Sequence, residues 1–216
     1  MKLFLNLISL ILCLSCSGYR FKNQSNPFDN YGVRTVAIPL FLNQSPVPNA
    51  AAPFTKEITL LLSQYPGLEI VGADAGHADA VLIGIVNSKD KISETVRTTG
   101  YKITNSVAPK ALSGRSDFFV PFSTEIKLEV NFILIKDPST KEIELASSEL
   151  GPSLKGNPKI LFNETIPISG SFNREIHDEA GSQVNFTQNK GAQERTVRNM
   201  AQALAQNFKE MVLYAF

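Results

Sequence analysis

The chain has 216 residues, of which 43% are hydrophobic, and its 21 basic and 20 acidic side chains give a formal net charge of +1. This near balance of charge provides no global attraction to nucleic acid and argues against a nucleic-acid-binding protein. The length suffices for one substantial hydrophobic core and is short for two.

The N-terminal segment is predicted to be an export signal. Lys2 is followed by an apolar run that reaches Leu12 and is interrupted only by Asn6 and Ser9. An apolar stretch of about a dozen residues is too short for a hydrocarbon core that takes about 20, so we expect it to direct export and then to be removed.

Cys16 is the predicted site of lipid attachment. In a lipoprotein signal a cysteine follows the apolar region directly and a small residue precedes it, and Ser15 meets that requirement. Cleavage before Cys13 would instead have to follow the bulky Leu12. We therefore predict a signal peptide over residues 1–15. The alternative is a plain signal peptide that contains both cysteines.

The mature chain is predicted to begin with a tether over residues 16–32, which are polar and contain Pro27. Ser17 rather than Asp follows the anchor, a pattern typical of sorting to the outer membrane, so we expect a lipid-anchored protein that faces the periplasm. Removal of residues 1–15 takes away Lys2 and no acidic residue, which leaves no net charge. Since no cysteine remains for a disulfide, an apolar core must stabilise residues 33–216, predicted to be a single domain.

The first part of this domain is predicted to contain strands and one helix. Residues 33–41 are rich in β-branched and aliphatic side chains, which favours a strand, and shorter strands are predicted over residues 68–71 and 80–86. A helix lies between them, with Pro53 in its first turn and a stop at Pro66 and Gly67. Its apolar face is formed by Phe54, Ile58, Leu61, Leu62 and Tyr65.

Residues 87–116 are polar and basic, and they include some residues that favour extended structure. Residues 125–132 alternate polar and apolar side chains, which predicts a strand with one wet and one dry face. A turn over residues 136–141 then predicts a hairpin with a return strand over residues 143–150. Residues 151–188 are rich in Gly, Pro, Asn and Ser, and we interpret them as a long excursion or an edge strand, with an extended stretch near residues 160–172.

The last predicted element is a long amphipathic helix over residues 192–216, in which Val197, Leu204 and Phe208 belong to one apolar stripe. The order of elements predicts an α+β fold. In this fold two helices pack on one face of a mixed, mainly antiparallel β-sheet to form a two-layer sandwich.

Well-specified catalytic motifs are absent, since the sequence contains no G-x-S-x-G, no H-E-x-x-H and no phosphate-binding glycine loop. Two loose groups contain residue types that can bind metals: Asp74, His77 and Asp79, and then Glu175, His177, Asp178 and Glu179. Acids and histidines at such spacings are ordinary turn and surface residues. We therefore predict no enzyme activity, no cofactor and no metal site.

Three segments resemble the LptE family, the outer-membrane lipoproteins of lipopolysaccharide assembly: residues 16–21 (CSGYRF), residues 36–43 (VAIPLFLN) and residues 78–85 (ADAVLIGI). The resemblance covers residues 16–86 through these motifs and the terminal helix through its architecture. The sequence departs from the family at Ser17, which separates Cys16 from Gly18, and at Ser45, where a Thr is common.

The resemblance implies a non-catalytic role. Members of the family sit in the lumen of the large β-barrel protein LptD and help to place lipopolysaccharide in the outer leaflet, so the implied partners are an LptD-type barrel, lipopolysaccharide and the outer membrane. Basic side chains attract lipid A phosphates by charge-assisted hydrogen bonds. The basic stretch therefore supplies the candidate lipopolysaccharide site, which consists of Arg97, Lys102, Lys110 and Arg115.

Two other classes of protein remain open. Lipoprotein activators of peptidoglycan synthases of the LpoB type share a strand that ends in Pro-Phe and an Ala-Asp-x-x-Leu strand. They need a long tether to reach through the cell wall, whereas residues 17–32 span at most about 55 Å when fully extended. A periplasmic hydrolase is supported only by the two loose groups of acids and histidines.

Overall fold

The computed structural model describes residues 25–72, 78–88, 95–104, 117–148, 154, 156–174 and 186–215. The predicted signal peptide, Cys16 and the tether as far as residue 24 lie outside this part of the chain. The described elements are η1 (Asp29–Tyr31), β1 (Thr35–Ala37), β2 (Leu42–Asn43), α2 (Ala51–Leu62), β3 (Glu69–Val71), β4 (Ala80–Asn87), β5 (Val96–Thr104), β6 (Asp117–Lys136), α4 (Thr140–Ala146), β7 (Ile160–Asn173) and α5 (Phe186–Ala215). The fold is α+β, as predicted.

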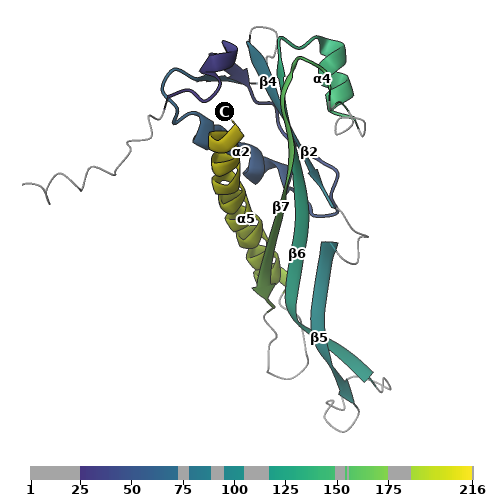
Figure 1. The fold of residues 1–216 in the computed structure, drawn as a ribbon. Helices are drawn as coiled ribbons and strands as arrows, with labels where there is room; N and C mark the ends of the chain where they lie inside the picture. Colours follow the sequence, from purple (N-terminus) through teal and green to yellow (C-terminus); the bar gives the residue numbers. More distant parts are fainter. Residues whose placement is uncertain are drawn as a thin grey trace, which may run out of the picture.

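The seven strands form one mixed sheet in which β6 is the central element. Strands β1 and β3 pair in parallel, β1 and β2 each pair with β4 in parallel, and β4, β5 and β7 all run antiparallel to β6. Since β7 pairs with the same β6 residues as β4 and β5 do, it occupies the opposite edge of β6. Strands β4 and β5 therefore lie end to end along one edge, and β5 continues beyond the helices (Figure 1).

Helices α2 and α5 cover one face of the sheet and lie side by side, with α5 over β7 (Figure 1). They run in the same direction, because the first turn of α2 lies beside Val197 and its C-terminal end lies beside Lys209. Aromatic rings join the two layers. The Phe132 ring lies 5.7 Å from that of Phe41 and 4.7 Å from that of Phe208, and the Phe162 ring lies 5.8 Å from that of Phe208.

Two glycines permit this close packing. A Cβ on Gly84 would lie 2.5 Å from the ring of Phe41, so the ring occupies the space that a side chain in β4 would take. A Cβ on Gly170 would lie 2.8 Å from side-chain atoms of Met200 and Thr196, so α5 approaches β7 at a point where only hydrogen fits. Both contacts require glycine for space and not for an unusual backbone conformation.

The other face of the sheet carries a smaller apolar cluster that includes Val81, Ile83, Ile133 and Ile135, with Ala146 of α4 packed against it. Helix α4 therefore lies on the side of the sheet opposite α2 and α5 (Figure 1). The fold thus has a third, short helix in addition to the two that the sequence predicts.

The prediction of a return strand over residues 143–150 is wrong, because residues 140–146 form α4. Ser139 and Glu142 form a capping box in which the Ser139 Oγ accepts from the Glu142 N–H and the Glu142 carboxylate accepts from the Ser139 N–H, at 2.7 Å. This arrangement satisfies two N–H groups at the start of a helix and favours helix over strand. The strand that returns along β6 is β7, which confirms the interpretation of residues 160–172 as an edge strand.

Other boundaries also differ from the predictions. The predicted strand over residues 33–41 is interrupted, since β1 ends at Ala37, β2 begins at Leu42, and Leu40 between them is 65% exposed. Packing begins before residue 33, because the Phe28 side chain is 2% exposed and belongs to the main core. Helix α5 begins at Phe186, six residues before the predicted start at residue 192.

Candidate functional site

A hollow between α2 and α5 lies where α2 begins. It is a pocket of about 440 Å³. The loop before α2 supplies Pro48 and Asn49, and the first turn of α2 supplies Ala52 and Pro53. The residues from α5 are Lys190, Gln193, Glu194, Val197 and Arg198. The pocket arises because the apolar faces of both helices turn toward the sheet, which leaves a cleft on their solvent side.

The start of α2 shapes one wall of the pocket. The helix begins at Ala51, and Ala50, which precedes it, offers no side-chain cap. Asn49 has a positive φ of 56°, so the chain turns sharply as it enters the helix. Pro53 fits in the first turn, where the N–H that proline lacks has no partner in the helix. Pro48 and Pro53 thus give this wall a stiff, apolar surface.

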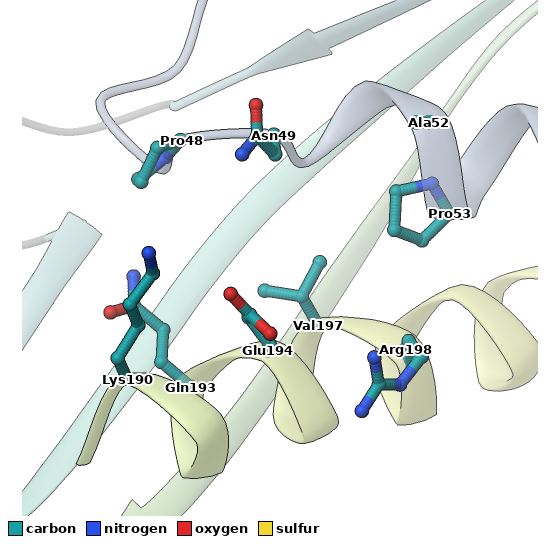
Figure 2. A pocket seen from close by; sticks show the side chains of 9 residues that line it. All are labelled: Pro48, Asn49, Ala52, Pro53, Lys190, Gln193, Glu194, Val197 and Arg198. Carbon is teal, nitrogen blue, oxygen red and sulfur yellow. The ribbon is translucent and has the colours of Figure 1, made fainter. Parts of the chain in front are cut away.

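The other wall carries charge. Lys190, Glu194 and Arg198 follow one another at intervals of four residues along one face of α5, and all three are exposed. Figure 2 shows the Lys190 and Glu194 side chains extending from α5 toward the start of α2, whereas Arg198 lies along α5. Within the described residues none of these three groups takes part in an ion pair or hydrogen bond. The pocket therefore presents unpaired donors and acceptors beside apolar carbon.

A second, shallower hollow of about 600 Å³ follows the same seam toward the C-terminal end of α2. Side-chain amides dominate its α5 wall, which includes Asn199, Gln202 and Gln206, and Gln64, just after the end of α2, also lines it. The two hollows lie one after the other along α2 and α5 and share no lining residue. The surface of the second hollow is polar, and Glu57 and Lys209 add charges of both signs.

The residues of the predicted lipopolysaccharide site are not brought together in the described part of the chain. Arg97 lies in β5, is exposed, and stands opposite Glu125 of β6 in register. Lys102 belongs to the same strand and pairs in register with Phe119. Lys110 and Arg115 lie outside the described residues, as does Cys16. The candidate site thus remains a prediction from the sequence.

Asp79 belongs to the first loose metal-binding group, and its contacts are structural. Its carboxylate accepts hydrogen bonds from the backbone N–H groups of Arg34 and Thr35, at 2.9 and 2.8 Å, and its own N–H donates to the Thr35 hydroxyl. The Arg34 and Thr35 N–H groups hold the pKa of Asp79 below its usual value. Asp79 thus joins the start of β1 to the start of β4.

The remaining members of the two loose groups, Asp74, His77, Glu175, His177, Asp178 and Glu179, lie outside the described residues. Among the residues that are described, no group of three or more His, Cys, Asp or Glu side chains is placed to hold a metal. Within that same part of the chain, no helix has both the length and the apolar character needed to cross a bilayer.

The motifs that resemble the LptE family occupy structural positions where the structure describes them. Asn43 ends β2, donates from Nδ2 to the Val47 carbonyl oxygen at 2.8 Å, and accepts from the Ser45 N–H and hydroxyl. Asp79 makes the connection described above. These residues hold the turn and the strand ends in place, so they account for part of the motif without forming a site.

The pocket was not predicted from the sequence. The only sequence signal for it is the spacing of Lys190, Glu194 and Arg198, and charges at this spacing are common on solvated helix faces. Its other wall comes from residues 48–53, more than 130 positions earlier in the chain. Only the packing of α2 beside α5 brings the two walls together.

Comparison with known proteins gives fold likenesses only. No family model matches the sequence, and no curated protein does. A candidate lipoprotein of Caulobacter crescentus is 11% identical, with a TM-score of 0.40 over 81% of this chain and 86% of the other. A Xanthomonas campestris protein of the DUF330 family is 8% identical, with a TM-score of 0.40 over 84% of each chain. A lipoprotein of Neisseria meningitidis is 12% identical, with a TM-score of 0.34 over 80% of this chain and 98% of the other. At these values the likenesses support no conclusion about function.

Proposed function

We propose that this chain is an outer-membrane lipoprotein, anchored through Cys16, that pairs with an LptD-type β-barrel and helps to assemble lipopolysaccharide in the outer leaflet. The role is structural and non-catalytic. The proposal is supported by the export signal with its cysteine after Ser15, and by the resemblance of residues 16–21, 36–43 and 78–85 to the LptE family. The two-layer α+β fold agrees with what that resemblance implies.

The observation that carries the proposal beyond the sequence is the polar face of the sheet. Along β6, Ile126, Leu128 and Val130 point into the core beneath α2 and α5. The residues between them point to the other face, because successive side chains of a strand alternate. On that face lie Glu125, Lys127, Glu129, Ser169 and Ser171, which are half-buried or exposed.

A polar sheet face suits the interior of a barrel. The lumen of an outer-membrane barrel is lined by polar side chains and water, in contrast to its apolar outer surface. A domain that enters such a lumen must present hydrogen-bonding groups and small hydroxyls there. The sheet face formed by residues 125–129 and 169–171 does so. An apolar face of the same size would instead favour contact with lipid or with another apolar surface.

Direct contact with lipopolysaccharide is assigned to Arg97, Lys102, Lys110 and Arg115. Arg97 is exposed in β5 and stands opposite Glu125, whose carboxylate lies 3.5 Å from the Lys127 ammonium. Alanine at all four positions should weaken binding of lipopolysaccharide to the purified protein in a salt-dependent way, because exposed charge pairs are screened by salt. Unchanged binding by the fourfold variant would exclude this site.

The first test is co-purification. The full-length protein with a C-terminal tag would be produced in its host, purified from detergent-solubilised outer membranes, and the co-purifying proteins identified by mass spectrometry. Recovery of one large β-barrel protein in near-equal amount is the expected result. Recovery of a peptidoglycan synthase, or of no partner, would contradict the proposal.

A further inference from the structure

The pocket between α2 and α5 has a chemical character that specifies its ligand. Its volume of about 440 Å³ lies within the range of about 300–1,000 Å³ that small-molecule sites occupy. Pro48, Ala52, Pro53 and Val197 form its apolar part. Such pockets commonly combine an apolar wall with a few convergent polar groups.

Charges of both signs line the pocket and disfavour ligands that carry a single charge. Glu194 extends into the space between the helices, so an anion would be repelled there (Figure 2). Lys190 extends into the same space one turn earlier, so a cation would be repelled in its turn. Arg198 also lines the pocket, but its side chain lies along α5 (Figure 2). A ligand with a single charge therefore meets a side chain of the same sign, whereas a neutral ligand does not.

The hydrogen-bonding groups of the pocket indicate which kind of neutral ligand fits best. Glu194 can only accept, Lys190 can only donate, and the amides of Asn49 and Gln193 do both. None of the four has a partner among the residues that the structure describes. A hydroxyl group is both donor and acceptor and rotates to suit its neighbour. A ligand with several adjacent hydroxyls can therefore satisfy all of these groups at once.

We propose that this pocket binds a neutral saccharide. The C–H face of a sugar ring packs against the Pro48, Pro53 and Val197 wall, and its hydroxyls bond to Glu194, Lys190 and the neighbouring amides. A peptide matches the pocket less well, because each peptide group offers one donor and one acceptor at a fixed spacing. The inference goes beyond the proposed function, since saccharide binding here requires neither the barrel nor the basic residues of β5.

The test is saturation-transfer difference NMR on the full-length protein in detergent. The probes are glucose, galactose and N-acetylglucosamine with their disaccharides, and triglycine serves as the peptide probe. Saturation transfer to at least one saccharide is the expected result. Transfer to none of them, or transfer to triglycine alone, would overturn the proposal.

Two variants locate the binding. Ala52 is exposed, so Ala52→Trp fills the pocket without disturbing the core, and it should abolish the transfer. Lys56→Trp places the same ring one turn further along α2, outside the pocket, and should leave the transfer unchanged. Equal transfer with Ala52→Trp and with the unaltered protein would show that the saccharide binds elsewhere.

A third variant tests the chemistry. Glu194→Ala should weaken binding about tenfold, the effect of losing a hydrogen bond to a charged group. The matched control is Glu210→Ala, which removes an exposed acid from the same helix outside the pocket. Equal effects of the two substitutions would overturn the assignment of Glu194. Barrel co-purification with Ala52→Trp separates the two proposals, since it should be unaffected.

Discussion

Replacement of Gly84 by alanine tests the packing of β4 against the main core. The new Cβ would lie 2.5 Å from the ring of Phe41, which is 3% exposed and also contacts Phe132 edge to face. Overpacking of this kind costs about 1–3 kcal/mol, and the loss of glycine flexibility in the unfolded chain returns about 0.4–1 kcal/mol. We therefore expect Gly84→Ala to lower the free energy of unfolding by about 1–2 kcal/mol.

The assay is urea denaturation of residues 17–216, followed by far-UV circular dichroism. Gly191→Ala is the control, because a Cβ there would come no closer than 3.6 Å to the Arg195 side chain and alanine favours α5 by about 1 kcal/mol. Phe41→Leu should relieve the clash, so the double variant should exceed the additive expectation by about 1 kcal/mol. Additive effects, or a stable Gly84→Ala variant, would refute the explanation that the Phe41 ring occupies this space.

Four further predictions concern other parts of the chain. Asp79→Asn should destabilise the fold by about 1 kcal/mol. Because folding lowers the pKa of Asp79, its contribution to the free energy of unfolding is complete above the pKa of the unfolded chain and disappears as the pH falls through the folded pKa. Urea denaturation at a series of acid pH values should show this loss in the unaltered protein and not in Asp79→Asn. Ser139→Ala should cost about 1 kcal/mol by removing the α4 cap, measured by urea denaturation, with Ser63→Ala as a control outside the cap. The Ser139 N–H, followed by Lys159, lowers the pKa of Glu142 to about 2, so α4 should persist in circular dichroism until the pH nears that value. Cys16→Ala should abolish labelling with radioactive palmitate and release the protein from membranes, and continued labelling would move the anchor to Cys13.

The periodic elements were predictable from the sequence. The stripe that contains Val197, Leu204 and Phe208 predicts α5, and the alternation around Ile126 and Leu128 predicts β6, because burial on one side leaves a regular pattern in each case. The apolar run over residues 80–86 predicts β4, whose central position in the sheet explains its burial on both faces.

Two elements could not be predicted by periodicity. Residues 140–146 are too short for a clear helical stripe, and the signal that distinguishes them is the capping pair Ser139 and Glu142. The strand predicted over residues 33–41 breaks at Pro39, where the chain leaves the pairing with β3 and resumes as β2 beside β4. Pro39 is a local signal of the break, because proline lacks the N–H that strand pairing needs. The strand that β2 then joins is determined by partners distant in sequence.

The pocket was the least predictable feature. Its chemistry depends on which residues of α2 face Glu194 and Lys190, and no periodic pattern in either helix contains that information. The candidate lipopolysaccharide site was visible in the sequence, but its geometry was not. Its residues share a composition, yet Arg97 alone among them has a described side chain, so composition predicts a charge without a geometry.

The length of β6 has a consequence for how the domain opens. At about 3.3 Å per residue its 20 residues extend about 65 Å, and it pairs with β4 along one half and β5 along the other. The helices cover the part of β6 that pairs with β4, whereas Phe119 and Phe122, in the part that pairs with β5, are 60% and 43% exposed. Amide hydrogens of β5 and of its partners in β6 should therefore exchange with solvent deuterium long before those between β4 and β6. This order of exchange would show that β5 separates from β6 and pairs with it again while the main core stays folded.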